Sequence, residues 1–391
     1  MKMTGILKMK IRLPDKNGRL YAHRLVGTRI DATPLTESSS RIIYSAAHVV
    51  SDPLSDSDPH GPAAIDWEAT LAFRIHLADL GLGIAEAMDT AQRGMGLDWS
   101  GAYELIRRTR EALPDARVAN GAGTDHLHPR DARSLDDVRK AYFKQLDAVQ
   151  KLDARVILMA SRALARVASG PDDYFAIYSE MLEACEHPVI LHWLGDMFDP
   201  ALAGYWGVKE FGGAMEVLLD IIAANEKKID GIKISLLDKD KEIRMRRRLP
   251  GSVKMYTGDD FNYPELIAGD QIGYSHALLG IFDPLAAAAA QAVTRLTEGD
   301  VAGFHAVLDP TVPLARHIFR APTQYYKTGV VFLAWLNGFQ NHFAMLNGAQ
   351  ASRSLPHLAE IFKMSDECGL LRQPDLAVER MRSLLKIYGV E

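Results

Sequence analysis

The chain has 391 residues, of which 48% are hydrophobic and 24% charged, and its formal net charge is −5. These values are typical of a globular protein with a large core, and the absence of a long basic run excludes a nucleic-acid-binding protein. The two cysteines, Cys185 and Cys368, exclude a disulfide framework and favour a reducing compartment. With no signal-peptide pattern and no apolar run of membrane-spanning length, we expect a cytoplasmic protein without a membrane partner.

The first segment has the pattern of a β-hairpin. Residues 6–13 and 19–25 are two alternating runs, and the turn-forming segment 14–18, with Pro14 and Gly18, separates them. We therefore interpret residues 1–40 as an N-terminal extension that precedes the main domain.

From residue 41 to about 290, short apolar segments alternate with amphipathic segments of helical period. The predicted strands are 41–49, 81–87, 116–122, 154–160, 188–193, 231–235, 253–257 and 271–274. The predicted helices include 66–80, 100–113, 135–152, 172–186 and 214–228. This alternation predicts parallel pairing, and eight units favour a closed TIM-type (β/α)₈ barrel, which leaves no exposed edge. An open doubly wound sheet is the alternative, although no GxGxxG motif follows the first strand.

The remainder of the chain has helical patterns only. Helices are predicted over 284–297, 301–319, 325–346, 356–367 and 376–388. We expect residues 291–391 to form a helical extension packed on the barrel, and we expect the protein to associate as a homo-oligomer.

Polar side chains follow each predicted strand at its C-terminal end, where TIM barrels carry their active sites. Near the first six ends lie His48, then Glu86, Asp89 and Thr90, then Asp125 and His126, then Arg162, then His192, then Lys233. Asp259 follows the seventh strand, and Ser275 and His276 follow the eighth. This concentration predicts a functional site at that end of the barrel.

Lys233 is the most unusual of these residues, because it lies between Ile232 and Ile234 in a short apolar strand. A buried ammonium group loses hydration, which lowers its pKa and can leave the amine free to attack a carbonyl carbon. The alternative is a lysine at a strand end that reaches solvent or pairs with Asp259.

The other candidates each have a second interpretation. His192 is a proton carrier, a metal ligand or a buried barrel histidine. Arg162 clamps a substrate carboxylate or forms a loop salt bridge. One carboxylate of Asp259 and Asp260 is expected to cap the next helix. A divalent-metal site is conceivable, but no HxH or HExxH spacing marks it. Its ligands would come from His48, Glu86, Asp125, His126, His192 and His276.

The segments around Lys233 resemble a known enzyme superfamily. The run from Asp230 to Ser235, followed by the run from Tyr256 to Asp260, is similar to the sixth and seventh strands of the dihydrodipicolinate synthase/N-acetylneuraminate lyase superfamily. The resemblance implies a TIM barrel in which Lys233 is the Schiff-base lysine. It extends over roughly residues 40 to 390, and the whole chain resembles a divergent, DUF993-like branch of the superfamily.

Two departures from the family pattern change the expected chemistry. His192 stands where the family has a catalytic tyrosine, and Glu86, Asp89 and Thr90 stand where it has its carboxylate-binding Gly-Thr-Thr-Gly-Glu type of motif. A carboxylate at Glu86 would repel a keto acid. The resemblance therefore implies that the lysine is retained while the pyruvate specificity is lost, and lysine biosynthesis is not expected.

Three functions follow as hypotheses. The first is a Schiff-base aldolase, lyase or dehydratase without a cofactor, acting on a small oxo compound such as a sugar-derived ketone. In it Lys233 forms the imine, His192 moves protons, and the other candidates (Glu86, Asp89, Thr90, Asp125, His126, Arg162, Asp259, Ser275 and His276) bind the substrate. The second is a metal-dependent sugar isomerase, epimerase or hydrolase. The third is a non-catalytic carbohydrate-binding barrel.

Overall fold

The computed structural model describes residues 9–56, 58 and 61–390. Two strands, β1 (Lys10–Pro14) and β2 (Leu20–Arg24), form an antiparallel hairpin in which Lys10 pairs with Arg24 and Pro14 with Leu20. The predicted hairpin is thus confirmed, although residues 6–8 of its first strand lie outside the described residues.

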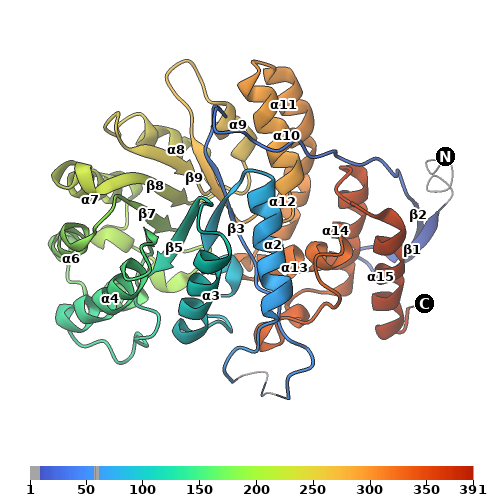
Figure 1. The fold of residues 1–391 in the computed structure, drawn as a ribbon, viewed down its shortest axis with the longest axis horizontal. Coiled ribbons are helices and arrows are strands. Elements are labelled where there is room, and N and C mark those ends of the chain that lie inside the picture. Colours follow the sequence, from blue (N-terminus) through green and yellow to red (C-terminus); the bar gives the residue numbers. More distant parts are fainter. Residues whose placement is uncertain (1–8, 57, 59–60, 391) are drawn as a thin grey trace. The chain divides into compact units, whose positions relative to one another are not determined.

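Eight parallel strands close into a barrel in the order β10-β3-β4-β5-β6-β7-β8-β9 (Figure 1). The strands are β3 (Ile43–Ala46), β4 (Gly83–Glu86), β5 (Val118–Ala122), β6 (Arg155–Leu158), β7 (Val189–Leu194), β8 (Ile229–Ser235), β9 (Lys254–Thr257) and β10 (His276–Leu279). The predicted TIM-type fold is therefore confirmed. Seven strands lie within or overlap the predicted segments.

The eighth strand was placed wrongly by the sequence pattern. Residues 271–274 form a turn, in which Asp270 accepts hydrogen bonds from the backbone amides of Ile272 and Gly273, and the strand begins only at His276. The short run 271–274 is exposed to solvent, whereas Ala277, Leu278 and Leu279 are fully buried. The position of this strand depends on which residues are buried in the folded barrel, and the local sequence pattern does not show this.

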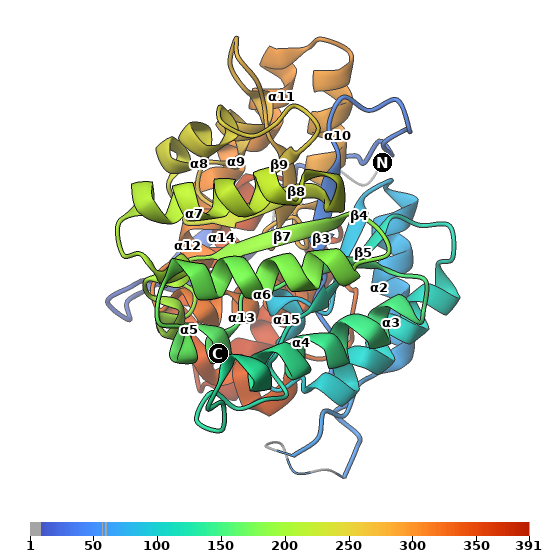
Figure 2. The same ribbon diagram turned by 90° about the vertical axis from the view of Figure 1, so that its left-hand side faces the viewer.

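Helices connect the barrel strands, and most of them bury an apolar face. They are α3 (Trp99–Ala112), α4 (Leu135–Gln150), α5 (Arg162–Val167), α6 (Pro171–Ala184), α7 (Phe211–Ala224), α8 (Lys239–Arg246) and α9 (Tyr263–Ala268). The polar α8 buries only Glu242 and Met245. Several begin at a side-chain cap. Asp98 caps α3, Ser134 and Asp137 form a capping box on α4, and Ser161 caps α5. Figure 2 shows α4, α6 and α7 lying alongside the strands of the barrel.

Contacts divide the chain into two compact units. We call the unit of Arg41–Ala47 and Leu82–Gly280 the barrel unit, and the unit of Met1–Ser40, His48–Gly81 and Ile281–Glu391 the helical unit. The helical unit contains α2 (Trp67–Asp79), α10 (Ala286–Thr297), α11 (Val301–Leu308), α12 (Val312–Ile318), α13 (Tyr326–Leu336), α14 (Leu355–Glu367) and α15 (Pro374–Ile387). Within it α13, α14 and α15 pack against one another (Figure 1).

The predicted C-terminal helices are confirmed with two differences: the predicted helix 301–319 is divided into α11 and α12 by a 3-10 turn at Asp309–Thr311, and one helix is shorter than expected. α13 ends at Leu336, because Gly338 adopts a φ of +79° and the chain turns, whereas the sequence pattern continued the helix to 346. Among the described residues, no helix combines the length and the apolar character that crossing a membrane requires.

Candidate active site at the C-terminal end of the barrel

Lys233 lies in the middle of β8 and projects into the barrel. Its register partners are His192 on β7 and Tyr256 on β9. Tyr256 belongs to the buried interior cluster that also contains Tyr44 and Ile190, and neighbouring parallel strands place paired side chains on the same face. The lysine is 7% exposed, and no hydrogen bond or ion pair joins its ammonium group to another described residue.

The surroundings of Lys233 weaken its charged form. Burial lowers the pKa of the Lys233 ammonium below its ordinary value, and the carboxylates of Asp260 and Asp89 offset part of this effect. The amine form is therefore more populated than in an exposed lysine. The two aspartates lie close enough to influence the charge, yet neither forms an ion pair with it.

His192 is more constrained than the sequence suggested. It is 1% exposed, and burial together with the charge of Lys233 lowers the pKa of the imidazole well below its ordinary value. Its Nε2 lies 3.2 Å from the Ser235 hydroxyl, and its buried Nδ1 contacts no described polar atom. His192 is therefore a neutral imidazole at pH 7, able to donate or accept a hydrogen bond but poorly suited to hold a proton.

The turn after β9 assigns different roles to its two aspartates. Asp259 accepts hydrogen bonds from the backbone amides of Phe261 and Asn262 and from the Asn262 side chain, so it organises the loop. Asp260, which is 4% exposed, is the carboxylate whose charge reaches Lys233. Asp259 was the expected substrate ligand, and the doublet in the sequence gave no signal to separate the two.

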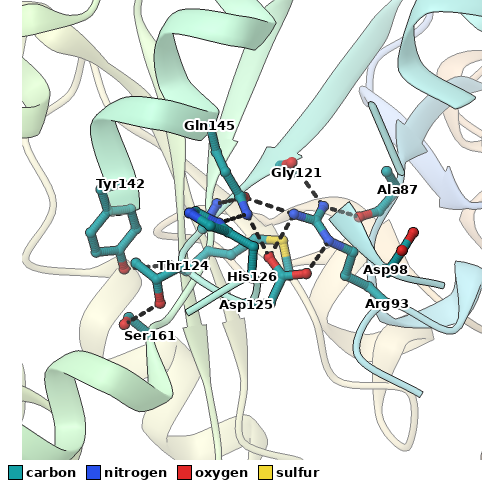
Figure 3. Close-up of polar contacts among 12 residues, drawn as sticks. Ala87, Arg93, Asp98, Gly121, Thr124, Asp125, His126, Tyr142, Gln145 and Ser161 are labelled. Carbon is teal, nitrogen blue, oxygen red and sulfur yellow. Dashed lines mark hydrogen bonds and ion pairs between the residues drawn. The ribbon is translucent and has the colours of Figure 1, made fainter. Parts of the chain in front are cut away.

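An arginine that the sequence analysis missed organises the loops after β4 and β5 (Figure 3). Arg93 forms a two-pronged ion pair with Asp125 through Nε and Nη2, at 2.7 Å each. It also donates to the carbonyls of Ala87 and Gly121 and to the Gln145 side chain. All five N–H groups of the guanidinium therefore have acceptors. A lone arginine in a loop carries no sequence signal for such a role.

Asp125 and His126 meet in the same network. Burial raises the pKa of Asp125, but the charge and hydrogen bonds of Arg93 outweigh it and hold that pKa below the ordinary value. Gln145 donates from Nε2 to Asp125 Oδ1 at 2.9 Å, and this nitrogen also lies 2.8 Å from His126 Nδ1 (Figure 3). The two predicted residues thus lie together beside the barrel mouth.

A small pocket of about 60 Å³ opens among these loops and is bordered by His192. Several predicted site residues, together with Arg93, line it, namely Asp89, Asp125, Arg162 and His192. Arg162 is ion-paired with Asp199, another lining residue. Lys233 lies one strand beyond His192 and does not itself border this pocket. Thr90 and His126 likewise lie outside its lining.

Three expected substrate ligands lie away from this group. Glu86 is fully buried and bonds to the Thr109 hydroxyl of α3, because alternation turns its side chain to the outer face of β4. His276 lies at the N-terminal end of β10, where its Nδ1 accepts from the backbone amide of Ile42. Ser275, just before it, donates to Glu242. Because the eighth strand was predicted too early in the chain, Ser275 and His276 were expected after its C-terminal end, whereas they lie at the N-terminal end of β10.

The residues proposed as metal ligands do not converge either. Among the described residues, no group of three or more His, Cys, Asp or Glu side chains has metal-binding geometry. Of the six candidates, only Asp125 and His126 belong to one network. His48, in the helical unit, is bonded to Asp283 instead.

Solved structures that are similar to this fold include dihydrodipicolinate synthases and proteins of that family. A putative dihydrodipicolinate synthetase from Pseudomonas aeruginosa is 17% identical, with a TM-score of 0.60, over 83% of this chain and 99% of its own. A 4-hydroxy-tetrahydrodipicolinate synthase from Methylacidiphilum fumariolicum SolV is 16% identical, with a TM-score of 0.63, over 87% of this chain and 99% of its own. A prophage protein of the family from Escherichia coli K12, solved with pyruvate, is 12% identical, with a TM-score of 0.62, over 90% of this chain and 99% of its own.

These likenesses define the class of the protein as a TIM barrel with the fold of the dihydrodipicolinate synthases. A search of curated protein sequences finds no match. The chain belongs to the family described as "Protein of unknown function (DUF993)", whose model matches residues 11–390. The predicted DUF993-like family is thereby confirmed, and the solved structures confirm the fold that the resemblance implied.

Proposed function

We propose that the protein is a Schiff-base lyase, an aldolase or dehydratase, in which Lys233 forms an imine with a small oxo compound. The observation that carries the proposal is the state of Lys233, which is buried in the barrel interior, has a lowered pKa and is without an ion pair among the described residues. A structural lysine at 7% exposure would be expected to pair with a carboxylate, because burying an unpaired charge is costly.

In the proposed reaction, the lone pair of the Lys233 amine attacks the carbonyl carbon of the substrate. The carbonyl oxygen takes up two protons and leaves as water, so that a C=N bond replaces the C=O bond. The protonated imine then accepts an electron pair from the neighbouring carbon. In an aldolase the pair comes from the C–C bond, the β-hydroxyl group loses its proton and becomes an aldehyde, and the enamine carbon then takes up a proton. In a dehydratase the pair comes from the C–H bond, whose proton leaves, and the β-hydroxyl group then departs as water. Attack of water on the remaining iminium releases the product and restores the Lys233 amine. Asp260 and Asp89 stabilise the positive charge of the protonated imine, because their charges favour a cation at this nitrogen.

The neutral state of His192 defines its part in the proposal. An imidazole that stays unprotonated does not store a proton between steps, but it can orient the Ser235 hydroxyl or bond to the substrate oxygen. The family tyrosine is not replaced by Tyr256 either, since the Tyr256 hydroxyl donates to Asp230 at 2.7 Å.

The charges around the pocket favour a neutral, hydroxylated substrate over a keto acid. Arg93 and Arg162, which line the pocket, are already paired with Asp125 and Asp199. Among the described lining residues, therefore, no unpaired cation is available for a substrate carboxylate, whereas Asp89 can accept from a hydroxyl group. The pocket is bordered by His192, the register partner of Lys233. Its small volume suits a compound of a few carbon atoms whose carbonyl group extends past His192 to the lysine. A ketose fragment such as dihydroxyacetone meets these conditions.

The test is reductive trapping with borohydride, read as an increase in intact mass. We expect dihydroxyacetone or glyceraldehyde to give a stable adduct and pyruvate to give much less. Lys233→Arg serves as the control, because it keeps the charge but forms no imine with the substrate. If none of these compounds gives an adduct that depends on Lys233, or if pyruvate reacts best, the proposed reaction or its substrate class is wrong.

A further inference from the structure

The helical unit contains a cavity of about 410 Å³ that takes no part in the imine chemistry. Five parts of that unit border it: the segment from Arg29 to Ala32, His76 on α2, the start of α10, the segment that follows α13 and the segment that follows α14. Its size is within the range of pockets that bind small molecules.

One carboxylate oxygen of Asp283, a residue on the wall of this cavity, lacks a hydrogen-bond donor among the described residues. Its Oδ2 lies 2.7 Å from both the backbone amide and the ring Nδ1 of His48. Its Oδ1 is buried and contacts no donor among the described residues, although the side chain is 0% exposed. Leaving a buried carboxylate oxygen without a donor is costly. A ligand with a hydroxyl group in the cavity would supply the missing hydrogen bond.

Two arginines on the border of the same cavity have positive charges that no described carboxylate neutralises through an ion pair. The Arg372 guanidinium lies 4.5 Å from the centroid of the Phe339 ring. The Nη1 of Arg29 donates to the carbonyl of Arg372 at 3.3 Å, which holds the two arginines next to each other. Asp31 also borders the cavity but forms no ion pair with either arginine. The guanidinium pair has the chemistry that binds carboxylate or phosphate.

The first turn of α10 is a third feature of the cavity wall. Ala286 and Ala287 border the cavity, and no side chain caps the helix. Backbone amides in the first turn of a helix lack intrahelical acceptors and are suited to bind oxygen atoms of a ligand.

Because Asp283 Oδ1 lacks a donor and the two guanidinium groups lack ion-pair partners among the described residues, we propose that this cavity binds a small hydroxylated oxyanion. Its hydroxyl group donates to Asp283 Oδ1, and its carboxylate or phosphate contacts Arg372 and Arg29. Such a compound is a hydroxy acid or a phosphorylated polyol, and the two share the same recognition chemistry. The site is separate from Lys233, so its occupancy does not depend on the proposed imine reaction.

Calorimetric titration of the full chain tests the proposal with five probes: glycerol 3-phosphate, D-glycerate, glycerol, acetate and inorganic phosphate. The site recognises a hydroxyl group and an anionic group together. At least one of glycerol 3-phosphate and D-glycerate should therefore bind about tenfold more tightly than glycerol, acetate or inorganic phosphate. Which of the two binds more tightly identifies phosphate or carboxylate as the anion. If glycerol, acetate or inorganic phosphate binds as tightly as the better of the first two probes, or if no probe binds, the proposal is overturned.

Two variants connect binding to the named residues. Arg372→Gln removes an exposed cation and should weaken binding of the better probe about tenfold, whereas Arg24→Gln, an exposed arginine of β2, should not change it. Asp283→Asn should abolish the preference for the hydroxylated probe, and its melting curve establishes that it folds. Lys233→Arg should bind as the unchanged protein does. Equal weakening by Arg372→Gln and Arg24→Gln would contradict the site.

Discussion

A lysine inside a parallel barrel exchanges water for an apolar environment, and this exchange favours the neutral amine. At Lys233 the loss of hydration lowers the pKa, and the charges of Asp260 and Asp89 oppose this effect without forming ion pairs with the ammonium group. This balance suits an imine-forming residue, because the amine must be free to attack and the later iminium must be stabilised.

The balance at Lys233 predicts the effect of removing one aspartate. Competitive labelling with acetic anhydride should give Lys233 a midpoint below the ordinary lysine value of about 10.4. Asp260→Asn should lower that midpoint further, because Asp260 raises the pKa of Lys233. Asp240→Asn, on the exposed part of α8, is the matched control and should leave it unchanged. An unchanged or higher midpoint in Asp260→Asn would contradict the arrangement described for this site.

Arg93 shows how one side chain holds two loops of the site. Its five N–H groups bond to Asp125, Gln145 and two backbone carbonyls, and the residue is 4% exposed. Lysine retains the charge but has only three donors. Arg93→Lys should therefore lower the free energy of unfolding by about 2 kcal/mol or more, measured by urea denaturation, because buried acceptors lose their donors. Arg107→Lys, a half-exposed residue of α3, is the control, and an equal effect of both would contradict this role.

At the scale of elements, the turn from β9 into α9 depends on close packing at Gly258. A Cβ atom at this position would lie 2.3 Å from the Ser235 hydroxyl and 2.5 Å from the Ile234 carbonyl. The amide of Gly258 also donates to that carbonyl at 2.8 Å. The glycine thus allows the turn to lie against β8, beside Lys233.

Replacement of Gly258 should therefore damage both stability and the site. Gly258→Ala is expected to cost about 1–3 kcal/mol of folding stability, the usual cost of overpacking, and to move the midpoint of Lys233 by displacing Asp260. Urea denaturation and amine labelling measure the two effects. Gly251→Ala is the control, because a Cβ there meets no atom within 4 Å. A fully stable Gly258→Ala variant with an unchanged Lys233 midpoint would show that the turn is not so constrained.

A buried histidine on α14 predicts sensitivity of the helical unit to acid. His357 is 1% exposed and stacks on His317 at 4.2 Å, and burial, His317, Arg320 and Arg353 lower its pKa to about 2. Between this value and the unfolded pKa of about 6.5, the unfolded state binds more protons. Stability should therefore fall as the pH falls below about 6.5.

Removal of the titrating group should make this dependence weaker. In His357→Leu, the free energy of unfolding between pH 6.5 and 4 should fall less steeply, by up to about 1.4 kcal/mol per pH unit. His187→Gln, an exposed histidine, should keep the original slope. Urea denaturation across this pH range provides the measurement, and equal slopes in all three proteins would exclude His357 as a source of the acid sensitivity.

For the whole molecule, the sequence was sufficient for the barrel because seven of its eight strands overlap predicted apolar segments, and only β10 was misplaced. It was sufficient to place Lys233 in a buried strand, since a charged residue between two isoleucines stands out, whereas its role in catalysis stays a prediction. It failed where the outcome depends on contacts between distant segments. The outward direction of Glu86 depends on its strand register, and the roles of Asp260 and Arg93 depend on partners brought close only by the closed barrel.

The central claim is that Lys233 is the residue that forms an imine with a small oxo compound. Peptide mapping by mass spectrometry, after borohydride trapping with dihydroxyacetone, tests this claim most directly. We expect a stoichiometric adduct on the peptide that contains Lys233, and none in Lys233→Arg. An adduct that maps instead to exposed lysines such as Lys140, at the same level in both proteins, would contradict it.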